Sequence, residues 1–229
     1  MPVLLAAFLA ACGAHVHHRV RPGETLYAIG WRYGVDYRTL ARWNGIDPPY
    51  TIRPGQVLRV APPRPNWWEE EEAEAQDADA PPPTVKKRTA PTTSPPPPKA
   101  ASSGPIAWRW PVQGPILRTF RLQPPVNKGI DIGGRLDAPV RAAAGGEVVY
   151  AGQGLIGYGN LVIVKHDQNF LSAYAHNKTL LVKEGDRVSA GQVIARMGRD
   201  NRGRVALHFE IRRRGKPVDP LRLLPRRGG

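Results

Sequence analysis

The sequence predicts two small folded domains of different class, an α+β domain and an all-β domain, joined by a proline-rich linker. Residues 19–61 combine turn residues with apolar positions at helical spacing. Residues 62–104 are low in complexity, whereas residues 105–225 alternate apolar and polar positions in short runs separated by glycines. With 229 residues, the chain is long enough for each domain to bury its own core.

The N-terminus carries an apolar run that ends at the single cysteine, Cys12. Residues 1–11 are too few to cross a bilayer as a helix, which takes about 20 residues, and are typical of a secretory signal. The segment 9–12 (Leu-Ala-Ala-Cys) resembles the lipobox of bacterial lipoproteins, in which the cysteine is lipidated. This resemblance implies a removed signal peptide, a lipidated spacer over 12–18 and, from Gly13, an outer-membrane anchor facing the periplasm. The alternative is an ordinary signal peptide followed by an incidental cysteine.

In the first domain, the spacing of apolar residues predicts two helices between two strands. A helix over 26–33 would be ended by Gly34, and Asp36 would cap a second helix that buries Leu40. A short strand is expected at 57–60. The predicted order is therefore strand, helix, helix, strand.

The same domain resembles the LysM carbohydrate-binding module. The matching segments are 20–26 (Val-Arg-Pro-Gly-Glu-Thr-Leu), 43–46 (Trp-Asn-Gly-Ile) and 52–58 (Ile-Arg-Pro-Gly-Gln-Val-Leu). The resemblance implies binding to the N-acetylglucosamine units of a glycan strand, here peptidoglycan. The residues it implies at the sugar groove are Gly23, Glu24, Thr25 and Ile46.

The linker contains an acidic run at 69–72 and the proline runs 81–83 and 95–98. Such a composition cannot bury enough apolar surface to offset the entropy of ordering, so we expect the linker to be disordered. The pair Trp67-Trp68 has no counterpart in this reading and stays unexplained.

The second domain is predicted to be an all-β sandwich or barrel. The segment 108–112 is expected to start its series of short strands. Alternation then predicts strands at 148–151, 161–164, 171–175, 193–195 and 207–211.

Positive charge is concentrated in this second domain. From residue 105 onward there are 21 Lys/Arg and 9 Asp/Glu, most of the formal net charge of +14. Such a surface suits nucleic acid, an anionic envelope polymer or an acidic protein. The run 212–214 (Arg-Arg-Arg) lacks interleaved stacking aromatics, which argues against nucleic acid.

Three segments of the second domain resemble the active-site motifs of LytM-type (lysostaphin-like) zinc peptidases. They are 127–131 (Asn-Lys-Gly-Ile-Asp), 174–176 (Tyr-Ala-His) and 206–210 (Ala-Leu-His-Phe-Glu). In that family the motifs are His-x-Gly-x-Asp, Tyr-x-His and His-x-His. The resemblance implies a degenerate LytM domain over 105–225, in which two of the expected histidines are replaced.

By this resemblance, the zinc ligands would come from positions 127, 131 and 208, and positions 176 and 206 would supply catalytic imidazoles. Asn127 offers a poor donor for zinc, and Ala206 offers none. Asp131, His176 and His208 keep the family's residue types. We therefore expect no bound metal, no cofactor and no peptidase activity.

The combination of lipobox, LysM module, proline-rich linker and degenerate LytM domain resembles the family of NlpD-like cell-division lipoproteins. Members of that family activate an N-acetylmuramoyl-L-alanine amidase, which splits the septum between daughter cells. The resemblance implies three partners: peptidoglycan, the amidase and, through the lipid, the membrane. The residues expected at the amidase-docking groove are Asn127, Lys128, Asp131, Tyr158, His176, Arg204 and His208.

Two alternative functions stay open on the sequence. A zinc endopeptidase could cut peptidoglycan cross-links with a reduced ligand set. A structural tether could bind the wall without regulating another enzyme.

Overall fold

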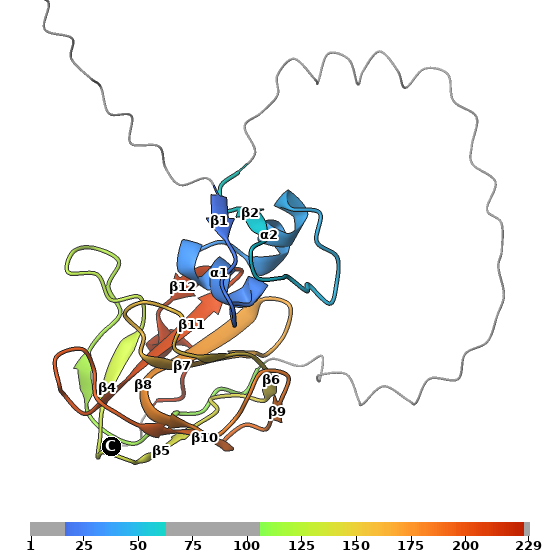
Figure 1. The fold of residues 1–229 in the computed structure, drawn as a ribbon. Coiled ribbons are helices and arrows are strands. Elements are labelled where there is room, and N and C mark those ends of the chain that lie inside the picture. Colours follow the sequence, from blue (N-terminus) through green and yellow to red (C-terminus); the bar gives the residue numbers. More distant parts are fainter. Residues whose placement is uncertain (1–16, 63–105, 227–229) are drawn as a thin grey trace, which may run out of the picture. The chain divides into compact units, whose positions relative to one another are not determined.

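The computed structural model describes residues 17–62 and 106–226. The described residues of both predicted folded domains belong to one compact unit. Most of their helices and strands are labelled in Figure 1. The predicted signal peptide, Cys12, Trp67-Trp68 and nearly all of the predicted linker lie outside the described residues. Within the described ranges, no helix has the length and apolar character needed to span a membrane.

The first domain has the predicted order of strand, helix, helix and strand. Its elements are β1 (His17–Arg19), α1 (Leu26–Tyr33), α2 (Tyr37–Trp43) and β2 (Val57–Arg59). The two strands pair antiparallel, with His18 opposite Leu58.

The helix ends follow from the capping residues. The side chain of Thr25 accepts a hydrogen bond from the backbone N–H of Ala28 at 3.1 Å and so begins α1. Gly34 ends it in the left-handed conformation, with φ of 67°. Asp36 caps α2 by accepting from the N–H of Arg38 at 3.0 Å. The apolar faces then meet in a core that includes Val20, Leu26, Ile29, Leu40, Ala41, Leu58 and Val60.

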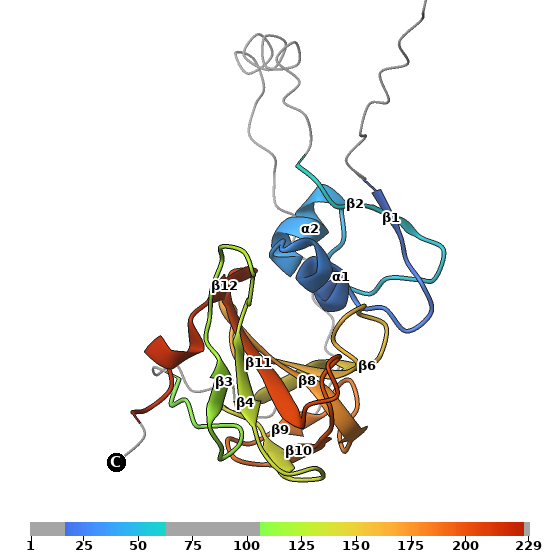
Figure 2. The same cartoon turned by 90° about the vertical axis from the view of Figure 1, so that its left-hand side faces the viewer.

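The second domain is built from antiparallel strands. They are β3 (Ile116–Arg118), β4 (Ile130–Gly133), β5 (Pro139–Arg141), β6 (Gly146–Gly152), β7 (Asn160–Lys165), β8 (Phe170–Leu180), β9 (Arg187–Val188), β10 (Val193–Met197), β11 (Ala206–Arg213) and β12 (Lys216–Val218), followed by the 3-10 helix η1 (Pro220–Arg222). The main sheet has the order β3-β4-β11-β8-β7-β6-β9, with β11 between β4 and β8 (Figure 2). The five strands predicted by alternation lie within β6, β7, β8, β10 and β11, which confirms the all-β prediction.

The predicted first strand at 108–112 is wrong. This segment forms no strand, although Trp108 and Val112 are buried in the core of the domain. The N–H of Arg141 donates to the carbonyl of Pro111 at 2.9 Å. The N–H of Arg109 likewise donates to the carbonyl of Ala143 at 2.7 Å. Neither bond is returned, because Pro111 has no N–H and the N–H of Ala143 donates to the hydroxyl of Tyr174, so no ladder forms.

Alternation along β11 separates a core face from a site face. Leu207, Phe209 and Ile211 lie in the core, as the sequence predicts. Ala206, His208 and Glu210 take the opposite face. In register, His208 lies opposite both Asp131 of β4 and Ala175 of β8.

The long strand β8 bends at His176, which has a φ of 63°. Residues 170–175 pair with β11, and residues 177–180 pair with β10. The left-handed backbone at His176 is uncommon for a residue other than glycine. The bend places the His176 side chain beside His208, with ring centroids 6.1 Å apart.

Candidate functional site

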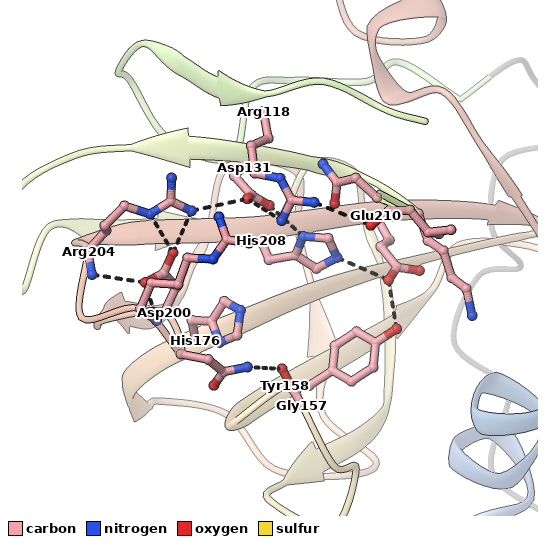
Figure 3. Close-up of a pocket in the computed structure, with 14 residues that line it drawn as sticks. Arg118, Asp131, Gly157, Tyr158, His176, Asp200, Arg204, His208 and Glu210 are labelled. Atoms are coloured by element: carbon pink, nitrogen blue, oxygen red, sulfur yellow. Dashed lines mark hydrogen bonds and ion pairs between the residues drawn. The ribbon is translucent and has the colours of Figure 1, made fainter. Parts of the chain in front are cut away.

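A cavity of about 380 Å³ opens on the site face of β4, β11 and β8 (Figure 3). All seven residues that the sequence placed in a groove line this one cavity: Asn127, Lys128, Asp131, Tyr158, His176, Arg204 and His208. Four further charged residues also line it, namely Arg118, Asp200, Arg202 and Glu210. The cavity thus gathers side chains from six separate stretches of the chain.

His208 lies between two carboxylates at the centre of the cavity (Figure 3). Its Nδ1 is 2.7 Å from Oδ1 of Asp131, and its Nε2 is 3.1 Å from Oε1 of Glu210. Burial acts to lower the pKa of His208, but the two carboxylates outweigh it and raise the pKa to about 9. At neutral pH both ring nitrogens therefore carry a proton and donate a hydrogen bond.

Asp131 is held by cations as well as by His208. Its Oδ2 is 3.4 Å from the guanidinium of Arg118 and 3.7 Å from that of Arg204. Burial alone would raise the pKa of Asp131, yet the hydrogen bond from His208 and the charges of His208, Arg118 and Arg204 hold it below its usual value. The carboxylate is therefore ionised, and the positive charges of its neighbours balance its negative charge.

The two replaced positions contribute no strong metal donor. The side-chain amide of Asn127 donates to the carbonyl of Thr119 at 3.0 Å, and its backbone pairs with Arg121 in both directions. Asn127 is thereby fixed to the β3–β4 connection. Ala206 is buried and has no polar side-chain atom.

These residues do not fit a catalytic zinc ion. Such an ion takes three protein donors and leaves a fourth position for water. Here Asp131 and His208 are the two donors of the family set that remain, and the guanidiniums of Arg118 and Arg204 beside Asp131 repel a dication. In the stretches that the structure describes, no three His, Cys, Asp or Glu side chains form a metal-binding group.

His176 differs from His208 in its charge. Burial and the positive charge of His208 both lower the pKa of His176, so its ring is neutral at pH 7. Within the described part of the chain, its buried Nδ1 has no hydrogen-bond partner. Its backbone N–H donates to the carbonyl of Tyr158 at 2.9 Å, which ties the bend in β8 to the loop before β7.

Two loops line the cavity, the one that contains Gly157 and the one that contains Asn201, and a hydrogen bond links them. The side chain of Asn201 donates to the carbonyl of Gly157 at 3.0 Å (Figure 3). Asp200 accepts from the guanidinium of Arg204 at 2.7 and 2.8 Å and from the backbone N–H groups of Arg202 and Arg204. These bonds fix the loop that carries both arginines.

The carboxylates of the cavity are all paired, but two of its cations are not. Asp131, Asp200 and Glu210 each accept from several donors. By contrast, the side chains of Lys128 and Arg202 are exposed and make no hydrogen bond, ion pair or ring contact among the described residues. Of the lining residues, Val126 is 48% exposed, and Ile156, which precedes the lining residue Gly157 in the chain, is 88% exposed. The rim is therefore positive and partly apolar.

The residues predicted for sugar binding lie in the turn before α1 and in the loop after α2. The carboxylate of Glu24 is 2.6 Å from His18 and 2.9 Å from Arg32, and its side chain is only 5% exposed. Thr25 is committed to capping α1, and Ile46 packs on the core of the domain. Gly23 supplies the turn, with φ of 76°.

Comparisons with known proteins agree with this arrangement. Residues 18–61 match the LysM domain, and residues 125–220 match peptidase family M23. A lipoprotein NlpD/LppB homolog of Pseudomonas aeruginosa is 53% identical, over 91% of this chain and 76% of that protein. The murein hydrolase activator NlpD of Escherichia coli is 38% identical, over 92% of this chain and 68% of that protein. The uncharacterized lipoprotein YgeR of Escherichia coli is 39% identical, over 92% of this chain and 82% of that protein.

These identities extend through both folded domains and over more than two thirds of each relative. The resemblance drawn from the lipobox, the LysM segments and the altered motifs is confirmed. The chain belongs to the NlpD/LppB family of lipoproteins, which joins a LysM domain to a domain of peptidase family M23.

Proposed function

We propose that this chain is a non-catalytic lipoprotein that binds peptidoglycan and activates an N-acetylmuramoyl-L-alanine amidase during septal wall splitting. Its lipid anchor at Cys12 would hold it in the outer membrane, facing the periplasm. The name of the Escherichia coli relative, murein hydrolase activator, supports a hydrolase as the partner. The LysM domain supports peptidoglycan as the second ligand.

The observation that carries this proposal is the state of positions 127 and 206, where the related peptidases have histidines. The side-chain amide of Asn127 donates to the carbonyl of Thr119 at 3.0 Å, and the buried Ala206 has no polar side-chain atom. Of the zinc ligands, Asp131 and His208 alone keep the family's residue types, one fewer than a catalytic zinc takes. The cavity is better suited to bind a protein than to hydrolyse a peptide bond.

The rim of the cavity suits a partner that brings acidic and apolar side chains. Lys128 and Arg202 offer unpaired cations, and Val126 and Ile156 offer exposed apolar surface. Aligned charges speed the encounter of two proteins, and apolar contacts hold the complex. Activation further requires that the chain bind the active form of the amidase more tightly than its inactive form.

The test uses purified chain, each amidase encoded in the same genome, and dye-labelled cell wall. We expect no dye release by the chain alone and at least tenfold faster release by one amidase when the chain is present. Release by the chain alone would favour the endopeptidase instead. No effect on any amidase would favour the structural tether.

A matched pair of variants ties the effect to the cavity. Lys128→Glu with Arg202→Glu should reduce activation at least tenfold, because acidic partner groups are then repelled. Lys183→Glu with Arg187→Glu makes the same change in net charge at exposed positions away from the cavity. If both double variants activate equally well, the cavity is not the docking surface.

A further inference from the structure

Glu210 connects the docking cavity to helix α1 of the LysM domain, within the same compact unit of the chain. Its Oε1 accepts from the hydroxyl of Tyr158 at 2.7 Å and from His208 at 3.1 Å. Its Oε2 accepts from Arg212 at 3.0 and 3.1 Å. Glu210 and Arg212 are both 1% exposed, so this ion pair is shielded from water.

The remaining donor of Arg212 binds α1. Its Nη1 donates to the backbone carbonyl of Trp31 at 2.6 Å, and its guanidinium lies 3.7 Å from the centre of the Trp31 ring. Such stacking on an indole is attractive and strengthens when water is excluded. The Trp31 side chain, 3% exposed, packs in a cluster with Val149, Leu161 and Ala173 of the second domain.

A second contact holds the loop that carries Tyr158. The guanidinium of Arg32 donates to the carbonyl of Gly154 at 2.7 Å, and also pairs with Glu24 at 2.9 Å. Thr25 donates to the carbonyl of Val149 at 3.1 Å. Helix α1 therefore contacts the loop that carries Tyr158, and also Arg212, the ion-pair partner of Glu210.

We infer that Trp31 and Arg212 are positioning residues for the docking cavity, so that the LysM domain shapes the surface on which the amidase binds. Trp31 covers Arg212, Arg212 orients Glu210, and Glu210 fixes Tyr158 and His208. Without the indole, water reaches the ion pair and the carboxylate loses its single orientation. This inference rests on the proposed function, since it concerns the same surface.

The first test measures amide hydrogen exchange in the full chain. Trp31→Ala should speed exchange at least tenfold at the amides of Tyr158 and His176, which bond within this region at 3.2 and 2.9 Å. Exchange in the ladder between β4 and β11 should stay within threefold of the unmodified chain. Trp31→Phe, which keeps a ring over Arg212, should restore protection.

The second test measures amidase activation with the same proteins. Trp31→Ala and Arg212→Lys should each raise the concentration of chain needed for half-maximal wall release at least tenfold. Trp31→Phe and Arg213→Ala, an exposed neighbour of Arg212, should stay within threefold. The lysine variant keeps the charge but lacks the planar group that stacks and bonds on three sides.

The inference holds only if both tests give these results. Unchanged exchange at Tyr158 and His176, equal loss of protection throughout the domain, or normal activation by Trp31→Ala would each overturn it. Failure of the proposed function has a different signature, because the unmodified chain would then speed wall release by none of the amidases.

Discussion

The two residues that depart from the family's motifs offer little to a metal ion. Asn127 directs its amide to the carbonyl of Thr119, and Ala206 has no polar group. Positive charge lies beside Asp131 on His208, Arg118 and Arg204. Glu210 has a pKa lowered to about 2, since its hydrogen bonds and cationic neighbours outweigh the burial that would raise it.

Restoring the two replaced histidines should restore zinc binding. Asn127→His combined with Ala206→His supplies a third ligand and an imidazole for bound water. We expect the double variant to hold about one zinc per chain after dialysis, measured by elemental analysis, and at least tenfold more than Ala206→His alone. Equal zinc content in the unmodified chain and in the double variant would contradict our assignment of the site.

His166 gives the stability of the second domain a defined dependence on pH. Burial lowers its pKa to about 4, from an ordinary value of 6.5, although its hydrogen bond to the carbonyl of Gly145 opposes this shift. As the pH falls below 6.5 the unfolded chain takes up a proton first, so stability is complete above 6.5 and is lost between 6.5 and 4. The loss amounts to about 3 kcal/mol at most.

This dependence is measured by urea unfolding at pH 7, 5.5 and 4. The difference in unfolding free energy between the unmodified chain and His166→Asn should shrink as the pH falls. A difference that stays constant from pH 7 to pH 4 would show that His166 does not titrate in the folded state as described.

At the scale of elements, strands β8 and β11 determine where the cavity lies in the second domain. Alternation on β11 sends His208 and Glu210 to one face, and the bend of β8 at His176 turns its second half onto β10. Close backbone approach makes the bend possible. A Cβ added to Gly198 would lie 2.5 Å from the carbonyl oxygen of His176 and 2.7 Å from the backbone nitrogen of Lys178.

Gly198→Ala should therefore destabilise the chain and displace His176. Forcing a methyl group against backbone atoms costs about 1–3 kcal/mol, to be measured by urea unfolding. Gly145→Ala is the matched control, because its added Cβ would meet its nearest neighbour at an ordinary 3.5 Å. Equal stability of the two variants would mean that the bend tolerates a side chain.

Much of this site can be predicted from the sequence. The remainder depends on how segments far apart in the chain pair in the fold. The His-x-Glu spacing on an alternating strand predicts that His208 and Glu210 share a face. The partnership of Arg118 with Asp131 depends on the register of β3 against β4, which no local pattern encodes. The ion pair between Asp200 and Arg204 lies in a loop, where the sequence predicts a turn but not its side-chain contacts.

The segment 108–112 illustrates the opposite error. Its apolar residues are indeed buried, so the sequence indicated burial correctly and strand pairing incorrectly. Pro111 removes the N–H that a ladder needs, and this local rule outweighs the apolar pattern.

At the scale of the whole molecule, the net charge of +14 favours contact with the anionic cell wall. Such attraction weakens with salt, because the screening length falls from about 10 Å at 0.1 M to about 3 Å at 1 M. Sugar recognition by the LysM domain depends on neutral contacts and should persist.

We therefore expect binding to purified cell-wall sacculi to fall at least threefold between 0.1 and 1 M sodium chloride. Binding to chitin, an uncharged polymer of N-acetylglucosamine, should change less than twofold. Both are measured by co-sedimentation. An equal loss of binding to sacculi and to chitin would show that binding to the cell wall depends on charge no more than sugar recognition does.

The bend of β8 at His176 provides an intrinsic reporter of whether a partner occupies the cavity. The N–H of His176 bonds to the loop before β7, and its carbonyl accepts from Gly198 in the segment after β10. One residue thus joins three segments at their meeting point. A protein seated over this junction restrains all three at once, so slowed deuterium uptake there would reveal occupancy without a label on either molecule.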